Sequence, residues 1–328
     1  MKTEFEQRSS SRLRRKLREG STVYEKHYVT NDWDDDMNVI QKRACDEISL
    51  LRQMASADGF RQRLGVVRIA ECDPTVPMIS TFEVSGDSLE NCILHHRSFR
   101  SDLRPWLTAG RWLKQFQRLS LPPEIHERCS RRDPADMVEY CDLRLKSLSE
   151  FGYLWPGADL HRSILDVVDQ LQVLSKAESV STVWVHSDFS PGNIMWDGRT
   201  ITPIDFAMAT EGHPLADATY LIHRMEMHQI YRPWLRIPVD HIRRAVLRGL
   251  GVPASDSTAA YRMLMIKHQI CRLHTYVRRP ARAMKQALHD CWVRGVLKRK
   301  LRHAAGQSLR CENADSGPCG RSPRTQIS

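Results

Sequence analysis

One segment of the sequence carries oxygen-bearing side chains at spacings that suit phosphate chemistry. His186 and Asp188 follow a short apolar run, and Asn193 comes five residues after Asp188. Asp205 directly follows a second apolar run. A carboxylate can accept the proton of a hydroxyl group, and carboxylate and carbonyl oxygens are ligands that Mg²⁺ prefers. The pattern therefore predicts phosphoryl transfer from a nucleotide, with Asp188 beside the attacking hydroxyl and Asn193 and Asp205 holding the metal.

Two short strands are needed to position these side chains. The apolar runs 182–185 and 201–204 have the length and composition of buried strands, and Asp197-Gly198 predicts a hairpin turn between them. The polar residues that follow each strand would then meet at one end of the strand pair. The alternative is a surface Asp-Asn turn and a strand-capping aspartate without chemistry.

The segment resembles the catalytic motif of the aminoglycoside phosphotransferase/choline kinase superfamily, which is itself similar to the eukaryotic protein kinases. The resemblance implies that Asp188 is the catalytic base and that Asn193 and Asp205 ligate Mg²⁺. It also implies that His186 is a scaffold residue that braces the loop, and that ATP is the phosphate donor. Such a resemblance leaves the identity of the acceptor open.

Two neighbouring positions bear on this resemblance. Asp217, in the sequence Pro214-Leu-Ala-Asp217, matches a family aspartate that helps to hold the catalytic loop. Its local alternative, an acidic side chain at a helix N-terminus, is compatible with that role. Ser187 departs from the family, because many relatives have glycine between the histidine and the aspartate.

A buried carboxylate is predicted in the amino-terminal part of the chain. Apolar residues recur at helical spacing from Ile40 to Met54, and Glu47 borders this inward stripe. An unpaired buried charge is costly, so Glu47 needs a cation. In the family, a strand lysine contacts the ATP phosphates and pairs with a glutamate on the following helix, and Lys26, on a predicted strand at 22–29, matches in order and spacing. The alternative for Lys26 is a surface lysine on a strand.

The segment 78–86 resembles the linker between the two lobes of these kinases. The resemblance implies that backbone groups near Thr81 and Glu83 meet the adenine. No glycine-rich loop with the spacing G-x-G-x-x-G precedes the strand lysine. Only Gly20 and Ser21 are placed to form a turn over the phosphates.

Together these elements predict a two-lobed α+β fold of the protein-kinase type, with a small, mainly β amino-terminal lobe and a larger, mainly helical carboxyl-terminal lobe. We expect residues 1–20 to form a basic arm, either mobile or a poorly ordered first strand, and residues 21–85 to form the nucleotide-binding lobe. A further strand is expected at 66–70. Residues 86–303 would form the catalytic and acceptor-binding lobe, and residues 304–328, rich in small and polar side chains, a disordered tail.

Length and composition are those of a globular enzyme. The chain has 328 residues, of which 41% are apolar, enough to fill a core. No signal-type apolar segment or membrane-spanning run is visible. Nine scattered cysteines without a C-x-x-C pair argue against a disulfide framework or a zinc site. We therefore expect a cytoplasmic protein with reduced thiols.

The net charge of +10 is concentrated in the last third of the chain. From Tyr220 to Ser328 there are 21 Lys and Arg against 6 Asp and Glu, a balance of +15, so the remainder carries −5. Either these cations are solvated helix faces, or they meet an anionic partner. Because this region supplies much of the acceptor wall in kinases of this family, complementary charge favours a hydroxyl on an anionic small molecule, sugar or glycan over a polycationic aminoglycoside.

The same charge predicts a peripheral contact with an anionic membrane surface. Met284, Leu288 and Trp292 precede the basic run Lys298-Arg299-Lys300 on one expected helix. The alternative is a helix packed on the core with its cations solvated.

Three other classes of protein share some of these features. A protein kinase is disfavoured because Ala207 stands where the DFG glycine would be and no A-P-E follows. A non-catalytic pseudokinase would lack a metal ligand, and both Asn193 and Asp205 are present. A basic nucleic-acid-binding module has charge in its favour but lacks interleaved aromatic residues, so nucleic acid is a disfavoured partner.

Overall fold

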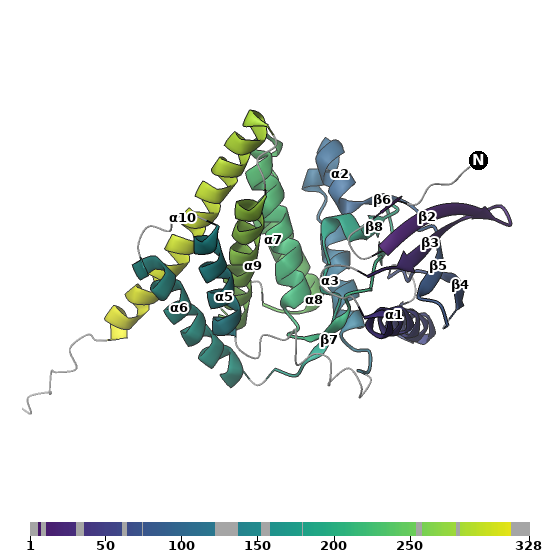
Figure 1. The fold of residues 1–328 in the computed structure, drawn as a ribbon, viewed down its shortest axis with the longest axis horizontal. Coiled ribbons are helices and arrows are strands. Elements are labelled where there is room, and N and C mark those ends of the chain that lie inside the picture. The colour runs from purple at the N-terminus through teal and green to yellow at the C-terminus, as the bar shows by residue number, and fades with distance from the viewer. Residues whose placement is uncertain are drawn as a thin grey trace, which may run out of the picture. The chain divides into compact units, whose positions relative to one another are not determined.

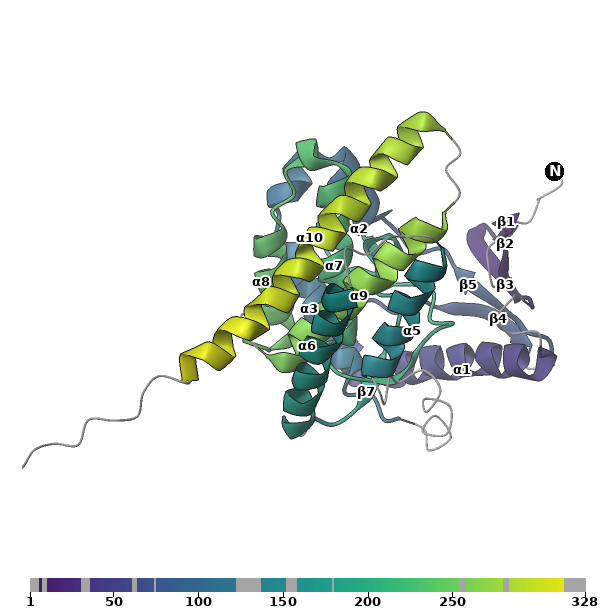
Figure 2. The same cartoon turned by 60° about the vertical axis from the view of Figure 1, so that its left-hand side comes forward.

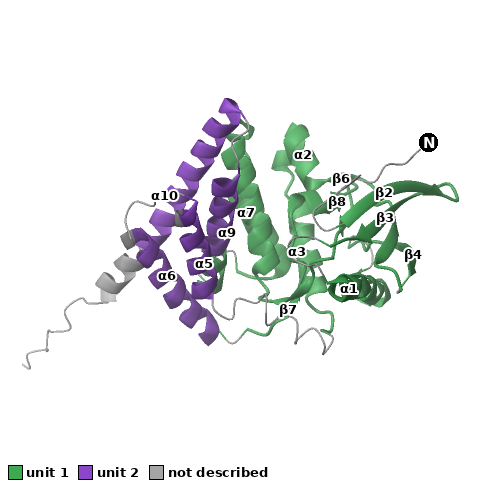
Figure 3. Ribbon diagram, in the orientation of Figure 1, with its two compact units in different colours: residues 1–135, 178–264 green, residues 136–177, 265–328 purple. Residues whose placement is uncertain are grey.

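The computed structural model describes residues 6–7, 11–30, 36–60, 64–73, 75–121, 137–151, 158–178, 180–253, 258–279 and 283–315. Its elements form an antiparallel sheet in the amino-terminal part and a larger helical carboxyl-terminal part, as the sequence predicted (Figure 1). The chain divides into two compact units, residues 1–135 with 178–264 and residues 136–177 with 265–328 (Figure 3). No described helix is long and apolar enough to cross a membrane.

The amino-terminal sheet of the first unit has five strands in the order β1-β2-β3-β5-β4, all antiparallel. Their bounds are β1 Glu6–Gln7, β2 Ser11–Arg18, β3 Ser21–Tyr28, β4 Ile69–Asp73 and β5 Met78–Phe82. Helix α1 (Met37–Ser56) packs on β3, β4 and β5 through its buried apolar stripe, and Figure 2 shows it lying along this sheet. The predicted strand at 66–70 begins three residues later, at Ile69, because the preceding residues are irregular.

Residues Ser11–Arg18 of the basic arm form strand β2, which agrees with the alternative of a first strand and not with that of a mobile segment. Strand β2 pairs with β3 over its whole length. Arg14 and Lys16 both form ion pairs with Glu25, which lies on β3 with only 6% of its surface exposed. The cations are therefore held by a buried partner, which a count of charges along the sequence does not reveal. Residues 1–5 and 8–10 lie outside the described residues.

The rest of the first unit surrounds two small sheets. These contain β7 (Val183–Val185) paired with β10 (Thr210–Gly212), and β6 (Asp87–Ser88), β8 (Ile194–Trp196) and β9 (Ile201–Pro203) in the order β6-β8-β9. The helices are α2 (Leu89–His95), α3 (Arg104–Phe116), α7 (Ala216–Tyr231) and α8 (Val239–Leu250). Helix α9 (Ala259–Arg278) begins in the first unit and ends in the second.

Helix α3 forms the aromatic core behind the loops that follow β7 and β9. Trp112 and Phe116 are fully buried, and the Trp112 ring centroid lies 5.7 Å from that of Phe189 and 5.9 Å from that of Phe206. Phe189 follows Asp188 and Phe206 follows Asp205 in the chain. The core therefore fixes the two loops through the residue after each aspartate.

Helices α3 and α8 pack closely at two glycines. A Cβ atom on Gly110 would lie 2.1 Å from the backbone oxygen of Val246, and one on Gly249 would lie 2.2 Å from the backbone oxygen of Leu107. Side chains larger than hydrogen would push the helices apart, so this crossing needs glycine on both sides.

The second unit contains α5 (Met137–Glu150), α6 (Ala158–Ala177), the end of α9 and α10 (Met284–Asp315). Within it, α6 packs against both α5 and α10. Residues 304–315 belong to α10, so the expectation of a disordered tail from residue 304 is wrong for this stretch. The remaining residues, 316–328, lie outside the described residues. The predicted lobe boundary after residue 85 falls inside the first unit, and the division into lobes stays a prediction.

Candidate active site

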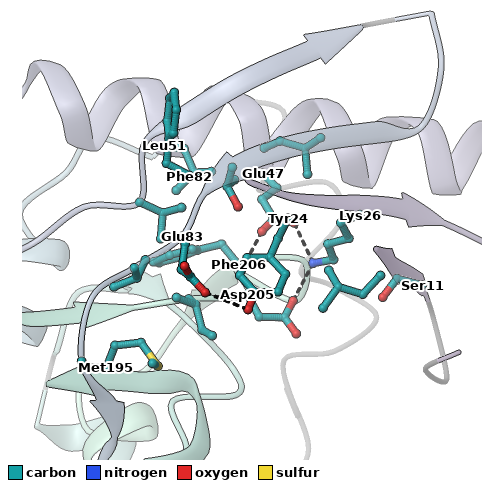
Figure 4. A pocket seen from close by; sticks show the side chains of 17 residues that line it. Ser11, Tyr24, Lys26, Glu47, Leu51, Phe82, Glu83, Met195, Asp205 and Phe206 are labelled. Atoms are coloured by element: carbon teal, nitrogen blue, oxygen red, sulfur yellow. Dashed lines mark hydrogen bonds and ion pairs between the residues drawn. The ribbon is translucent and has the colours of Figure 1, made fainter. Parts of the chain in front are cut away.

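Strand β3 and helix α1 meet at a buried cluster of charges. Lys26 Nζ lies 2.6 Å from Asp205 Oδ1 and 3.1 Å from Glu47 Oε2 (Figure 4). The hydroxyl of Tyr28 also donates to Glu47, and the Phe206 N–H donates to Glu47 Oε1 at 3.0 Å. Glu47 therefore has the cation that its buried position requires, and it joins the amino-terminal sheet to the loop that carries Asp205.

Electrostatics keep Lys26 charged in this cluster. Burial by itself would lower the pKa of Lys26, but the negative charges of Glu47 and Asp205 outweigh it, and the pKa is raised above its ordinary value. The alternative of a surface lysine is wrong, because only 12% of the Lys26 side chain is exposed. A charged ammonium held between two carboxylates is suited to contact a phosphate group.

The loop after β7 is held by Asp217, which lies in the first turn of α7. Asp217 Oδ2 accepts the His186 N–H at 2.7 Å, and Oδ1 accepts the Ser187 N–H at 3.0 Å. These bonds hold Ser187 at φ 66°, in the left-handed region where glycine is favoured. A serine in this conformation needs the support that these bonds from Asp217 give.

His186 is a fully buried part of this loop. Its Nε2 lies 3.1 Å from the backbone oxygen of Ile204, the residue before Asp205. Burial lowers the pKa of His186 to about 4, so the ring is neutral near pH 7 and donates through Nε2 to that oxygen. His186 therefore connects the loop after β7 with the loop after β9.

Asp188 and Asn193 are in direct contact. Asn193 Nδ2 donates to Asp188 Oδ2 at 2.8 Å and to the Asp188 backbone oxygen at 3.0 Å. Burial and then the charge of Asp205 raise the pKa of Asp188, while a hydrogen bond from Tyr220 and one from Asn193 oppose the rise. Asp188, Asn193 and Asp205 therefore share one electrostatic environment.

The donor set suits a divalent cation with several waters. Because the Asn193 nitrogen makes both hydrogen bonds, its carbonyl oxygen Oδ1 is the atom left for a ligand. Asp205, at φ 68°, keeps a third of its side chain exposed. The described residues contain no cluster of three or more His, Cys, Asp or Glu that could enclose a metal. Mg²⁺ usually keeps several waters and takes one or two carboxylates from the protein. A cation here would also reduce the repulsion between Asp188 and Asp205.

A cavity of about 350 Å³ opens beside this cluster. Its lining includes Lys26, Glu47 and Asp205 together with Thr81 and Glu83 of the predicted linker (Figure 4). The wall is mainly apolar, with residues such as Leu51, Val67, Ile79, Val84, Met195, Ile204 and Phe206. A cavity of this size and character can hold a flat base next to a charged group.

Backbone contacts in the linker differ in detail from the prediction. The N–H groups of Phe82 and Glu83 already donate to Arg68 and Thr22 backbone oxygens, both within 3.0 Å. Among the described residues of this segment, backbone donors for a base therefore begin at Val84. The turn before β3 consists of Glu19 and Gly20, both at positive φ. The cavity is lined by other residues of this hairpin, Ser11, Leu13, Tyr24 and Lys26.

The structure brings together every residue that the motif predicted, but not through the predicted strand pair. The hairpin turn at Asp197-Gly198 connects β9 to β8, while β7 pairs with β10. Sequence reasoning missed Tyr28 and Tyr220, which bond to Glu47 and Asp188. A signal for Tyr220 existed, since it lies three residues after Asp217 on the same helix and so on the same face.

Comparison with known proteins shows the family of this chain. The model of the phosphotransferase enzyme family, APH, matches residues 86–262, more than half of the chain. The chain therefore belongs to the phosphotransferase enzyme family. This membership confirms the predicted superfamily and the predicted enzyme class, an ATP-dependent phosphotransferase with an alcohol group as acceptor. No curated protein matches the sequence.

Solved structures with the same fold include an aminoglycoside phosphotransferase from Alicyclobacillus acidocaldarius, with a TM-score of 0.60, 14% identity, and coverage of 95% of this chain and 92% of that one. An ethanolamine kinase from Plasmodium vivax has a TM-score of 0.55, 12% identity, and coverage of 90% and 82%. The ADP-bound aminoglycoside phosphotransferase APH(2'')-Ib has a TM-score of 0.55, 14% identity, and coverage of 90% and 93%. These likenesses confirm the kinase-like α+β fold.

Proposed function

We propose that this protein transfers the γ-phosphate of ATP to a hydroxyl group of an anionic small molecule, sugar or glycan, with Mg²⁺ as cofactor. The observation that carries the proposal is the contact network Glu47–Lys26–Asp205 beside the Asp188–Asn193 pair. Lys26, Glu47 and Asp205 line the cavity, while Asp188, a carboxylate able to take a proton, is bonded to Asn193 and lies within the electrostatic influence of Asp205. Phosphoryl transfer depends on this combination of positioning and charge.

Each side chain has a role in the proposed reaction. Lys26, held by Glu47, binds the phosphates, and Asn193 and Asp205 hold Mg²⁺, which would neutralise charge on the phosphates. Asp188 orients the acceptor hydroxyl and takes its proton as the oxygen bonds to the γ-phosphorus. The bond from that phosphorus to the bridging oxygen breaks, and ADP leaves. His186 and Asp217 position the loop without touching the reactants.

The nucleotide would occupy the cavity lined by Thr81, Glu83 and Val84. ADP bound to the similar APH(2'')-Ib supports an adenine nucleotide as the donor. The Val84 N–H is the first backbone donor of the linker available to the base. Thr81 and Glu83 contribute to the wall of the cavity.

The charge of the chain indicates the class of acceptor. Similar structures include an ethanolamine kinase and aminoglycoside phosphotransferases, whose named compounds are cationic. This chain, in contrast, is basic from Tyr220 onward, which disfavours a polycation. An antibiotic kinase of the aminoglycoside type is the alternative, and turnover of streptomycin but not of anionic alcohols would establish it.

The test of the reaction compares wild type with Asp188→Ala and Asp205→Ala in an assay of ADP release with Mg²⁺. We expect losses of about 10³-fold or more for each variant, because each removes a group that acts on the transferring phosphate. The control is Asp197→Ala, which removes an exposed carboxylate in the β8–β9 turn. Activity that survives in the Asp188 and Asp205 variants contradicts the proposal.

A non-catalytic pseudokinase or a basic nucleic-acid-binding module is the alternative of another class. Such a protein would bind its partner equally well after Asp205→Ala. An inactive wild type across a broad panel of alcohols, with nucleotide binding absent in calorimetry, would favour this class. The complete set of charged contacts in the site favours the enzyme.

A peripheral membrane contact is proposed for α10 in the second unit. Met284, Leu288 and Trp292 lie one turn apart and are 81%, 68% and 50% exposed, so they form an apolar stripe on the surface of the helix. Arg299 stacks on Trp292, with its Cζ 5.9 Å from the ring centroid. Apolar side chains next to cations suit the interface of an anionic membrane.

Vesicle sedimentation tests this contact. Wild type should bind vesicles with phosphatidylserine more strongly than neutral phosphatidylcholine vesicles, and Trp292→Ser should lose about tenfold in affinity. Leu174→Ser, at an exposed apolar position of α6, is the matched control. Equal binding by the Trp292 variant contradicts the contact. The ATP requirement and the free thiols of the described cysteines suit the cytoplasmic side of such a membrane.

A further inference from the structure

Helix α7 presents a polar stripe toward the catalytic loop. Tyr220, Arg224 and His228 are spaced four residues apart, so they lie on one face of the helix in successive turns. The first turn of this helix contains Asp217, which holds the catalytic loop. The stripe is therefore anchored at the site by its own first turn.

The contacts of Tyr220 and His228 show which groups the stripe faces. Tyr220 makes a hydrogen bond to Asp188, the proposed base. Two turns later, His228 Nε2 lies 3.2 Å from Glu90 Oε1 on α2. Glu90 Oε2 in turn lies 2.8 Å from the position of a Cβ on Gly192, in the short 3₁₀ turn Pro191–Asn193 of the catalytic loop. Tyr220 therefore contacts the catalytic loop directly, and His228 is connected to the same loop through Glu90.

Arg224 occupies the turn between these two contacts. Its positive charge acts on both Asp188 and Glu90. Its Nε is buried, yet no hydrogen-bond acceptor reaches it among the described residues. A buried guanidinium donor without an acceptor is unfavourable, whereas the neighbouring Tyr220 has its partner. Arg224 therefore supplies a positive charge near Asp188, and its Nε–H can still donate a hydrogen bond to a ligand.

Guanidinium groups bind carboxylates and phosphates through parallel N–H donors, more specifically than an ammonium does. Glu90 does not satisfy Arg224 Nε, since the carboxylate of Glu90 is directed to His228 and the Gly192 turn. One helical turn, roughly 5 Å, separates Tyr220 from Arg224. A molecule with its hydroxyl at Asp188 would therefore bring a group a few bonds away next to the guanidinium.

We propose that Arg224 binds a carboxylate or phosphate group of the acceptor and thereby places the acceptor hydroxyl against Asp188. The inference rests on the proposed function and narrows it to alcohols with an anionic group several bonds from the reacting hydroxyl. Arg224 is then a specificity-determining residue. It selects the acceptor by charge, while the chemistry of phosphate transfer stays with Asp188 and the metal-binding pair.

Three four-carbon alcohols that differ at one end provide the test: 4-hydroxybutyrate, 1,4-butanediol and 4-amino-1-butanol. Wild type should transfer phosphate to 4-hydroxybutyrate with the highest kcat/KM. Arg224→Gln should lower kcat/KM for 4-hydroxybutyrate by about 10- to 100-fold relative to 4-amino-1-butanol, because it removes a charge-assisted contact. Arg224→Lys should restore part of the preference, and Arg224→Glu should reverse it.

Calorimetry in the presence of a non-hydrolysable ATP analogue and Mg²⁺ measures the dissociation constants of the three alcohols. These constants should rank the alcohols in the same order as kcat/KM does. The matched control is Arg248→Gln, an exposed arginine of α8, which should leave the order of the three alcohols unchanged. A purely structural role of Arg224 would lower activity with all three alcohols alike, and that result overturns the inference. So does a wild type that binds 4-hydroxybutyrate no better than 4-amino-1-butanol. A wild type without ATP turnover contradicts the proposed function instead, and the calorimetric order still decides the role of Arg224.

Discussion

The proposed nucleotide side and the proposed acceptor side of the site differ in how completely their charges are satisfied. On the nucleotide side, Lys26 contacts two carboxylates, and Glu47 accepts from Lys26, Tyr28 and Phe206. On the acceptor side, Arg224 carries a buried Nε that no described residue satisfies. The first arrangement is held together by contacts within the protein, whereas in our proposal the second would be completed by a ligand. An enzyme that always uses ATP as the donor can hold the donor site in a fixed geometry. An acceptor site that selects its substrate by charge would keep a hydrogen-bond donor for that substrate.

Lys26→Met should produce the largest change, because it leaves Glu47 and Asp205 without their shared cation. We expect the free energy of unfolding to fall by about 3–5 kcal/mol, and phosphate transfer to be lost. Urea denaturation measures the first effect and ADP release the second.

The double variant Lys26→Met/Glu47→Gln tests whether the loss of stability comes from the unpaired charge of Glu47. With the buried charge of Glu47 removed as well, the free energy of unfolding should recover in part while activity stays absent. If Lys26→Met leaves the stability unchanged, the cluster does not hold the amino-terminal sheet to the loop of Asp205.

Glu25→Gln should have an intermediate effect, confined to the nucleotide-side sheet. Burial would raise the pKa of Glu25, but hydrogen bonds from Lys16, His27 and Arg14 lower it to about 2. Because the folded-state pKa lies below the ordinary value of 4.5, the contribution of Glu25 is complete above that pH and is lost as the pH falls toward 2.

The measurement is urea denaturation between pH 2 and pH 7. Glu25→Gln should cost about 1–2 kcal/mol at pH 7, a value reduced by the partial exposure of Lys16, and the difference from wild type should disappear near pH 2. A difference independent of pH would show that the variant loses packing rather than charge pairing.

Tyr220→Phe should weaken the acceptor side by a smaller amount. It removes a hydrogen bond that lowers the pKa of Asp188, so that pKa should rise, and the acidic limb of the pH–rate profile should move to higher pH. We expect kcat near neutral pH to fall by about 3- to 10-fold. An unchanged profile would mean that the Tyr220 hydroxyl does not reach the carboxylate in the working enzyme.

Of these variants, Arg224→Met should change the free energy of unfolding least. Comparing it with Lys26→Met distinguishes the proposed acceptor side from the proposed nucleotide side most directly. Since its buried Nε has no partner among the described residues, we expect the free energy of unfolding to change by less than about 1 kcal/mol, in contrast to Lys26→Met. A loss as large as that of Lys26→Met would mean that Arg224 serves the fold and not the acceptor.

The candidate residues of the catalytic motif could be predicted because they are close together in the sequence. Two short strands are enough to bring their side chains together. Asp188 and Asn193 are five residues apart and touch, and the pairing of Lys26 with Glu47 followed from the position of Glu47 on an apolar stripe. The strand partners were not predictable. Runs of three residues, such as β7, β8 and β10, carry too little periodicity to identify or pair them.

The sequence by itself determined the candidate site residues, since their types and spacing are local properties of the chain. Tertiary structure alone decided how they are supported. It placed Asp217 beside a left-handed Ser187, gave the basic residues of β2 a buried partner in Glu25, and brought the charge of Arg224 near Asp188 with no acceptor for its Nε among the described residues. The reason is physical: burial and pairing depend on residues far apart in the chain, and the same arginine is a solvated charge on one surface and a ligand-binding group beside a buried loop on another.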